Sequence, residues 1–377
     1  MISRFKIFIQ ISGLMAAMTI GAGLFALPYI FHEAGWLTGL FYLFTLSGIV
    51  IVAHVLYLKV LAAAKDGESG RRLVGLAGIY FGRSGFGLGL VAVVGGLLFT
   101  LVVYLILGGQ FMSLVFAGLD PSVGLLIFWL LSSAPFLVAE TRFARLEFLG
   151  VILMTAIIAL IYFSARTYGA LFSVPAVNSV NIFLPFSAIL FSLAAWPVLE
   201  PIYRLHISSS AKERGGHPAL AITLGTLFAA LLYFAFVLGI FGSTGTITEE
   251  TVSGLVSWPN WKIGILGVLG LFAIWTSYIP IGFEISNSLA GDLKLSRRVS
   301  LAAVLFLPPL LIVFGLNNFL RAVGLAGGVF LSLQYLLIIL VSQKALKLRG
   351  LKKLLVGSIA ILFLLAAVYE VYYFVIQ

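Results

Sequence analysis

Long apolar segments alternate with short polar stretches along the whole chain. A helix needs about 20 apolar residues to cross ~30 Å of hydrocarbon, and the chain divides into about 11 segments of that kind. Membrane β-barrels instead show ~10-residue runs of alternating polarity. The pattern therefore predicts an all-α polytopic membrane protein. Its expected transmembrane helices cover residues 7–31, 36–63, 85–116, 122–139, 147–163, 182–203, 218–241, 262–289, 299–316, 321–341 and 352–374.

The first apolar segment carries an interruption near its middle. Residues 19–36 read TIGAGLFALPYIFHEAGW, which places Gly21, Gly23 and Pro28 inside it. Glycine permits close approach of a ligand to the backbone, and proline removes a hydrogen-bond donor. Unwound backbone at membrane depth is tolerated only where it is buried in protein or lines a polar cavity. The run predicts a broken helix at a binding site; close packing of a neighbouring helix against the glycines is the alternative.

The sixth segment is interrupted in a similar way. It reads FLPFSAILFSLAAWPVLEPIY over 183–203, with small residues just before Pro197. Many secondary transporters consist of two inverted halves, each beginning with a discontinuous helix, and their breaks meet near the midplane. We therefore predict one membrane domain over 1–377, with a first inverted repeat at 7–163 (helices 1–5), a second at 182–341 (helices 6–10) and an extra helix 11 at 352–374.

The basic residues fall mostly on one side of the predicted membrane. With a cytoplasmic N-terminus, Arg166, Lys262 and Arg321 are the exceptions among 23 Lys and Arg residues. This asymmetry follows the positive-inside rule and predicts a cytoplasmic N-terminus and an external C-terminus. It also accounts for the net charge of +10 without a nucleic-acid partner. Basic residues near the inner surface are expected to contact anionic lipid of the bilayer.

Several function classes lack the residues that they need. The chain has no cysteine, so disulfides and thiolate metal sites are excluded. It has no HExxH or Walker A pattern, and its three aspartates are dispersed, which argues against a membrane enzyme. It also has no TVGYG-like filter, and broken helices suit alternating access better than a channel.

Four runs resemble amino acid permeases of the amino acid/auxin and hydroxy/aromatic groups. They are GAGLFALPY…AGW at 21–36, LPFSAILFSLAAWP in helix six, WTS with SNSLAGDLK in and after helix eight, and RAVGLAGG before helix ten. The resemblance implies the leucine-transporter fold, with a 5+5 inverted repeat and broken helices 1 and 6. It also implies secondary transport of amino acids, neutral or aromatic, coupled to a Na⁺ or H⁺ gradient. Transport of another solute on the same fold is the alternative.

The resemblance places an amino acid at the two breaks. Amides of Gly21, Ala22 and Gly23 would face its carboxylate at the positive end of a half-helix. An amino acid is a zwitterion, so opposed half-helix ends neutralise both charges without ionised side chains. Tyr104 would bind the carboxylate, with a core tyrosine as the alternative. The remaining expected residues are those whose backbone carbonyls would accept from the ammonium, Met18, Thr19, Phe191 and Leu193, and the pocket residues Phe99, Ser192, Ala194, Trp196 and Trp275.

Two coupling schemes remain open at this point. Sodium-dependent members of the fold hold one ion with backbone carbonyls and two hydroxyls, and all-oxygen ligation suits a hard cation. The matching positions are the carbonyls of Ala17, Ile20 and Ala273 and the hydroxyls of Thr276 and Ser277. An ionisable residue within a span is a functional candidate by default. Glu284, Glu200 and His54 are the candidates for proton coupling.

The same resemblance suggests where the protein works. Short tails and compact loops are typical of prokaryotic members, so the expected location is the cytoplasmic membrane of a prokaryote. No organic cofactor is expected. The sequence indicates nothing about the oligomeric state.

Overall fold

The computed structural model describes residues 2–63, 72–116, 118–137, 146–208, 217–243 and 245–376. The described residues contain helices and no strands. Helix covers most of the described part of every predicted segment, which confirms the all-helical class; residues 138–139 of the fourth segment lie outside the description. The longer elements are α3 (Trp36–Ala63), α4 (Leu73–Val115), α5 (Pro121–Ser133), α6 (Leu146–Ser164), α9 (Pro218–Ser243), α10 (Asn260–Gly291), α11 (Arg297–Val313) and α14 (Gly350–Ile376).

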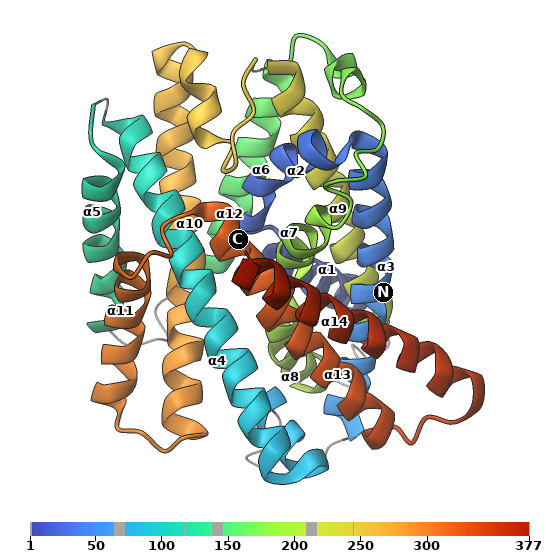
Figure 1. The fold of residues 1–377 in the computed structure, drawn as a ribbon. Coiled ribbons are helices and arrows are strands. Elements are labelled where there is room, and N and C mark those ends of the chain that lie inside the picture. The colour runs from blue at the N-terminus through green and yellow to red at the C-terminus, as the bar shows by residue number, and fades with distance from the viewer. Residues whose placement is uncertain are drawn as a thin grey trace.

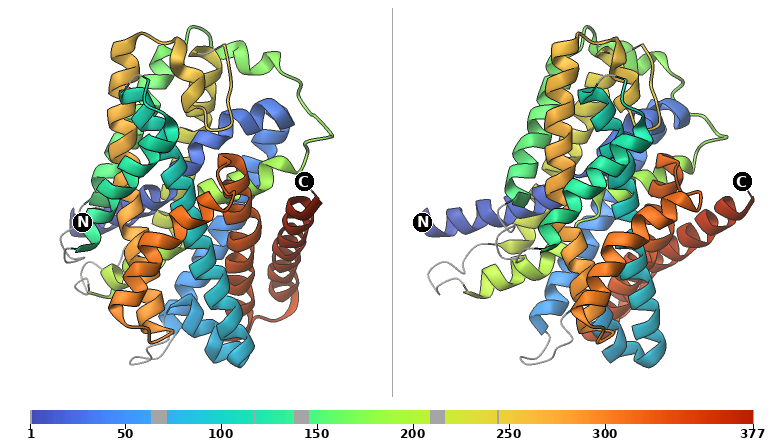
Figure 2. Two further views of the ribbon diagram at one scale, coloured as in Figure 1. Left: turned by 60° about the vertical axis from the view of Figure 1, so that its left-hand side comes forward. Right: turned by 90° about the vertical axis from the view of Figure 1, so that its left-hand side faces the viewer.

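The first and sixth segments are both broken, as predicted. The first consists of α1 (Ile2–Thr19), a 3₁₀ turn η1 (Ala22–Ala26) and α2 (Leu27–Ala34), with a bend of 48° at the break. The sixth consists of α7 (Leu184–Leu193), η5 (Trp196–Val198) and α8 (Leu199–Ser208). Figure 2 shows α1 projecting from the bundle toward the N-terminus.

The tenth segment departs from a regular helix too. It runs through α12 (Phe319–Gly324), a π-helical stretch η7 (Leu325–Leu331) and α13 (Ser332–Ala345). Its sequence LAGGVFL contains two adjacent glycines, and π-helical turns often mark functional positions. The stretch packs against α7 and α4, so it belongs to the wall of the central region.

Helix α4 begins earlier than the predicted start at residue 85. It starts at Leu73 and bends at Gly82, which has φ +67° and ψ −153°. Glycine adopts this left-handed conformation readily, and other residues rarely do. The bend lets residues 73–77 turn back into the core, where Leu73, Val74 and Ala77 are buried. A stretch that the sequence analysis assigned to a polar loop is therefore partly helix.

The arrangement places the broken helices among long continuous ones. In Figure 1, α5 and α11 lie on one side of the molecule and α3, α13 and α14 on the other, with α4 and α10 crossing between them. α10 packs against α4 and α6, and α1 packs against α9. Short 3₁₀ elements η2 (Ala134–Leu137), η4 (Tyr168–Ser173) and η6 (Val252–Ser257) follow or precede these helices.

Many large apolar side chains face outward, as expected for a chain in lipid. Leu130, Phe306 and Leu365 are each more than half exposed, on α5, α11 and α14. Seven helices in the described chain are long and apolar enough to span a membrane, or eight when the bent first pair counts as one span. The protein is thus a multi-pass membrane protein. Crossing by the shorter α5, α6 and α11, and with it the total of about 11, stays a prediction.

Candidate functional site at the two helix breaks

A cavity of about 50 Å³, here called the central cavity, lies where the two breaks meet. Most of the substrate residues expected from the sequence line it: Met18, Thr19, Gly21, Ala22, Gly23, Tyr104, Phe191, Ser192, Ala194 and Trp196. Pro197, which marks the second break in the sequence, lines it too, and sequence reasoning missed five further lining residues, namely Leu97, Thr100, Ile281, Leu331 and Gln334. These come mainly from α4, α10 and the tenth segment, and no local motif marks them.

The two glycines of the first break have different surroundings. A Cβ added to Gly23 would lie 2.6 Å from Ser192 Oγ and 2.8 Å from Ser192 Cα, so this glycine lets the two broken helices touch. A Cβ added to Gly21 would meet the Tyr104 hydroxyl at 3.4 Å, which is an ordinary contact. Gly23 is therefore required by close packing, while Gly21 borders open space in the cavity.

A tyrosine of α9 joins the backbones of the two breaks. The Tyr233 hydroxyl lies 2.6 Å from the carbonyl oxygen of Ser192 and within hydrogen-bond distance of the carbonyl oxygen of Thr19. A hydroxyl has a single proton to donate, so it satisfies one of these carbonyls at a time. The arrangement concentrates carbonyl acceptors from both breaks at one point, which suits a positively charged ammonium group.

The amides on the other side of the first break stand at a helix start. The first N–H groups of a helix have no partner within it, and the dipole makes that end positive. Ala22 and Gly23 begin the outer half of the first span, and both are buried. The two breaks thus offer acceptors and donors without an ionised side chain among the residues that line the central cavity.

Three predicted substrate residues do not line this cavity. Phe99 on α4 packs its ring against Phe330, with centroids 4.9 Å apart. Trp275 on α10 packs against Phe272 at 6.4 Å. Leu193 is fully buried at the end of α7. Which face a helical residue presents depends on how long helices pack, and the local sequence does not specify that packing.

A smaller cavity of about 40 Å³ lies beside the first break, at the predicted ion position. Ala17, Ile20 and Ser277 line it, together with Gly21 and Tyr104. The Thr276 and Ser277 hydroxyls both donate to the Ala273 carbonyl, at 2.8 and 3.1 Å.

Thr276 is not among the residues that line this ion cavity, although its side chain packs against Gly150 of α6, which does line it. A Cβ added to Gly150 of α6 would collide with Thr276 Oγ1. The predicted oxygen ligands are thus close together, with Ser277 nearer the cavity than Thr276. Among the described residues, no group of three or more His, Asp or Glu side chains could hold a metal.

An inner cavity of about 330 Å³ opens toward the predicted cytoplasmic side. It shares Trp196 and Pro197 with the central cavity, so the second break forms the wall between them. The two carboxylates named for proton coupling line this inner cavity. Glu284 lies 3.7 Å from the Arg72 guanidinium, and Glu200 pairs with Arg204 at 2.5 Å. Both are therefore ion-paired at the mouth of the inner cavity, away from the central one.

The third proton candidate, His54 on α3, is fully buried and does not line the central cavity. Its Nε2 lies 2.8 Å from the Tyr335 hydroxyl of α13. The Tyr335 ring stacks on Phe363 of α14. The hydrogen bond joins α3 to α13, and the ring stacking joins α13 to α14. These contacts give the histidine a structural role.

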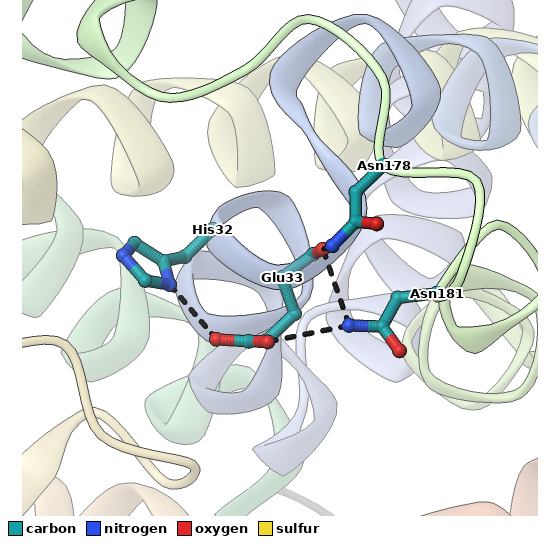
Figure 3. Close-up of polar contacts among 4 residues, drawn as sticks. All are labelled: His32, Glu33, Asn178 and Asn181. Atoms are coloured by element: carbon teal, nitrogen blue, oxygen red, sulfur yellow. Dashed lines mark hydrogen bonds and ion pairs between the residues drawn. The ribbon is translucent and has the colours of Figure 1, made fainter.

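Polar contacts at the outer end hold the outer halves of the broken helices together. Figure 3 shows Glu33, near the end of α2, with His32 and two asparagines that precede α7. The Asn178 and Asn181 amides donate to the Glu33 backbone carbonyl, at 2.9 and 3.4 Å, and Asn181 also donates to its carboxylate at 3.3 Å. These bonds connect α2 to the segment that leads into α7.

Next to this cluster lies the outer cavity, of about 390 Å³. It is lined by Glu33, Glu249, Arg321 and Glu370 among others, and is therefore much more charged than the central cavity. It is larger, but the helix breaks do not contribute to it. The backbone carbonyls and amides of the two helix breaks, which suit a zwitterion, lie at the central cavity.

The chain matches the family model of the tryptophan/tyrosine permease family over residues 6–375. No curated protein matches it in sequence.

Solved transporter structures share its fold at low sequence identity. MhsT in complex with L-phenylalanine superposes with a TM-score of 0.62 at 15% identity, covering 94% of this chain and 98% of that one. Mhp1, a nucleobase-cation-symport-1 family transporter with bound bromovinylhydantoin, gives 0.59 at 15% identity, covering 88% and 77%. A manganese transporter from Eremococcus coleocola gives 0.58 at 11% identity, covering 98% and 94%. The fold is that of the leucine transporter.

Proposed function

Since the chain belongs to the tryptophan/tyrosine permease family, we propose that it carries aromatic amino acids across a cytoplasmic membrane, driven by a Na⁺ or H⁺ gradient. The chain is a secondary transporter of amino acids and not an enzyme. We assign the substrate to the central cavity between the two breaks.

The convergence of the Thr19 and Ser192 carbonyls on the Tyr233 hydroxyl carries this assignment. A substrate ammonium would bind these carbonyls, and its carboxylate would lie at the start of the outer half-helix, near Gly21 and the Tyr104 hydroxyl. Both charges of an amino acid are then neutralised by preorganised backbone dipoles. The phenylalanine bound to MhsT shows that this fold can hold an aromatic amino acid.

Transport would proceed by alternating access around this site. The helices of the two breaks, α1 with α2 and α7 with α8, would rock against α4, α5, α10 and α11. The contrast between an inner cavity of about 330 Å³ and a central cavity of about 50 Å³ supports a conformation that opens to the inner side once the wall at Trp196 moves. The predicted inverted repeats, at 7–163 and 182–341, would provide the symmetry for this motion.

The test is uptake of labelled amino acids into proteoliposomes under an inward sodium gradient, an inward proton gradient or no gradient. We expect concentrative uptake of aromatic amino acids under one of the two gradients. Sodium-stimulated uptake that is lost in Thr276→Ala or Ser277→Ala would support the ion cavity beside the first break. Proton-stimulated, sodium-independent uptake would direct attention to Glu284 and Glu200. Failure to accumulate any amino acid, with folded protein, would favour another solute on the same fold.

A further inference from the structure

The side-chain amide of Gln334, on α13, is held in one orientation at the wall of the central cavity. Its Nε2 donates to the Ala92 carbonyl oxygen at 2.7 Å, and its Oε1 accepts from the indole Nε1 of Trp196 at 2.6 Å. An indole N–H can only donate and a carbonyl oxygen can only accept. Turning the amide round would therefore lose both bonds. Gln334 is 1% exposed, so its oxygen is a fixed, buried acceptor.

Trp196 uses this acceptor while it separates two cavities. It lines both the central and the inner cavity, and it is 6% exposed. On the inner side its ring meets Tyr57 of α3 edge to face, with centroids 6.1 Å apart. One side chain of the second break therefore provides a donor to Gln334 and a wall between the cavities.

The central cavity is too small for an aromatic amino acid while this wall is in place. Its volume is about 50 Å³, whereas small-molecule sites usually measure about 300–1,000 Å³. A side chain must move for the substrate ring to enter. Trp196 is suited to this movement because the inner cavity of about 330 Å³ lies directly behind it.

We propose that Gln334 Oε1 accepts the hydrogen bond of the substrate ring, from an indole N–H or a phenol O–H. Trp196 occupies this acceptor in the empty protein and is replaced by the substrate. The inference rests on the proposed function and specifies the substrates further: aromatic amino acids with a ring donor are preferred to those without one. Displacement of Trp196 would also open the wall to the inner cavity, so ring recognition and inner opening are linked.

Phenylalanine is the informative comparison, because it lacks only the hydroxyl of tyrosine. When it displaces Trp196 it leaves a buried oxygen without a partner, which costs more than a missing bond at a surface. Sites built around a ring donor reject the analogue that lacks it for this reason. One such bond corresponds to a preference of about tenfold.

The experiment measures binding by purified protein of two ligand pairs, L-tyrosine with L-phenylalanine and L-tryptophan with 1-methyl-L-tryptophan. Each pair differs at the ring donor. The variants are Gln334→Met and Trp196→Phe, and the control is Gln343→Met, the same change on the same helix at an exposed position bonded to Lys353. We expect about tenfold preference for the ring donor in the unmodified protein and in the control.

The two variants should have different effects, one on the preference and the other on the affinity. Gln334→Met removes the acceptor and should reduce the preference to within about twofold. Trp196→Phe removes the competing donor, so both ligands of a pair should bind more tightly, because neither has to break the bond between Trp196 and Gln334. The ratio within the pair should stay near tenfold, because the empty protein is common to both ligands. The ratio of the two dissociation constants within a pair is insensitive to changes in cavity size that affect both ligands equally. Trp196→Phe keeps the test valid if Gln334→Met does not fold.

Three outcomes would overturn the inference. The first is equal binding of tyrosine and phenylalanine by the unmodified protein, which leaves the proposed function intact. The second is a Gln334→Met protein that weakens all four ligands equally, which indicates a structural role. The third is a Trp196→Phe protein that binds tyrosine and tryptophan no more tightly than the unmodified protein does, which would show that Trp196 does not compete for the acceptor. If the unmodified protein binds none of the four ligands, the proposed function fails and the inference fails with it.

Discussion

At the first break, between α1 and η1, the chain omits side chains, whereas at the second, between α7 and α8, it places a large one. Gly23 allows Ser192 to approach closely, and the surroundings of the first break are backbone carbonyls and amides. At the second break Trp196 fills the space and bonds to Gln334. The first break is thus suited to bind the charged ammonium and carboxylate groups of a substrate, and the second is suited to bind its aromatic ring. An aromatic amino acid needs both kinds of site.

The largest effect is expected at the contact between the breaks. Gly23→Ala would place a methyl group 2.6 Å from Ser192 Oγ and 2.9 Å from the Phe191 ring, so backbone must shift at a cost of about 1–3 kcal/mol. We expect binding of all aromatic ligands to fall by more than about tenfold. Equilibrium binding with a thermal-stability check measures it.

Gly21→Ala is the matched control for this change. Its methyl group would make an ordinary contact with the Tyr104 hydroxyl at 3.4 Å. We expect the free energy of unfolding to stay within about 0.5 kcal/mol of that of the unmodified protein, because no backbone has to shift. Binding should fall less than in Gly23→Ala, although the methyl group would border the place of the substrate carboxylate. Equal loss in both variants would show that the close approach at Gly23 is not what the first break requires.

The next effect lies on the residue that joins the breaks. Tyr233→Phe leaves the Thr19 and Ser192 carbonyls without the hydroxyl that bonds them, and an unpaired buried acceptor costs about 1–3 kcal/mol. We expect the free energy of unfolding to fall by that amount in the empty protein. Saturating L-tryptophan should restore part of it, because the substrate ammonium supplies donors. A loss of stability that substrate does not reduce at all would place the ammonium elsewhere.

A smaller effect is expected at the ion cavity beside the first break. Ser277 lines that cavity and Thr276 does not, so Ser277→Ala should reduce sodium stimulation of uptake more than Thr276→Ala does. Neither variant should change the preference for tyrosine over phenylalanine, because the substrate ring binds at the second break. Uptake that responds to a proton gradient and not to sodium would contradict the ion assignment. A changed preference for tyrosine over phenylalanine would contradict the assignment of the ion and the substrate ring to separate sites.

The smallest effect is expected at the inner mouth. Glu284 and Arg72 are each about a third exposed and lie 3.7 Å apart, and ion pairs of that exposure are worth about 0–1 kcal/mol. Glu284→Gln should therefore leave uptake within about threefold under either gradient. Loss of gradient-driven accumulation with retained substrate exchange would instead make this carboxylate a coupling residue.

The first break could be predicted because its signal is local. Gly21, Gly23 and Pro28 lie within a single apolar run, and the sequence alone indicates that a helix cannot continue there. The second break was recognisable for the same reason, from small residues before Pro197. The helical fold followed from the length of the apolar segments.

The partners of the breaks could not be predicted because they are distant in the chain. Tyr233 is 214 residues from Thr19, and Gln334 is 138 residues from Trp196. No periodicity marks either residue as part of a site. The early start of α4 was missed because the positive φ of Gly82 turns an apparent loop into a bent helix. The placement of Phe99 and Trp275 depended on helix rotation, which packing determines.

The most direct test of the account is a structure of the protein with a brominated L-tryptophan, because the bromine locates the ring independently of the rest of the ligand. We predict that the bromine lies beside Gln334, in the space that Trp196 occupies in the empty protein. The ammonium should lie at the Thr19 and Ser192 carbonyls. A bromine in the charged outer cavity, with Trp196 still bonded to Gln334, would contradict the assignment of the substrate to the two helix breaks.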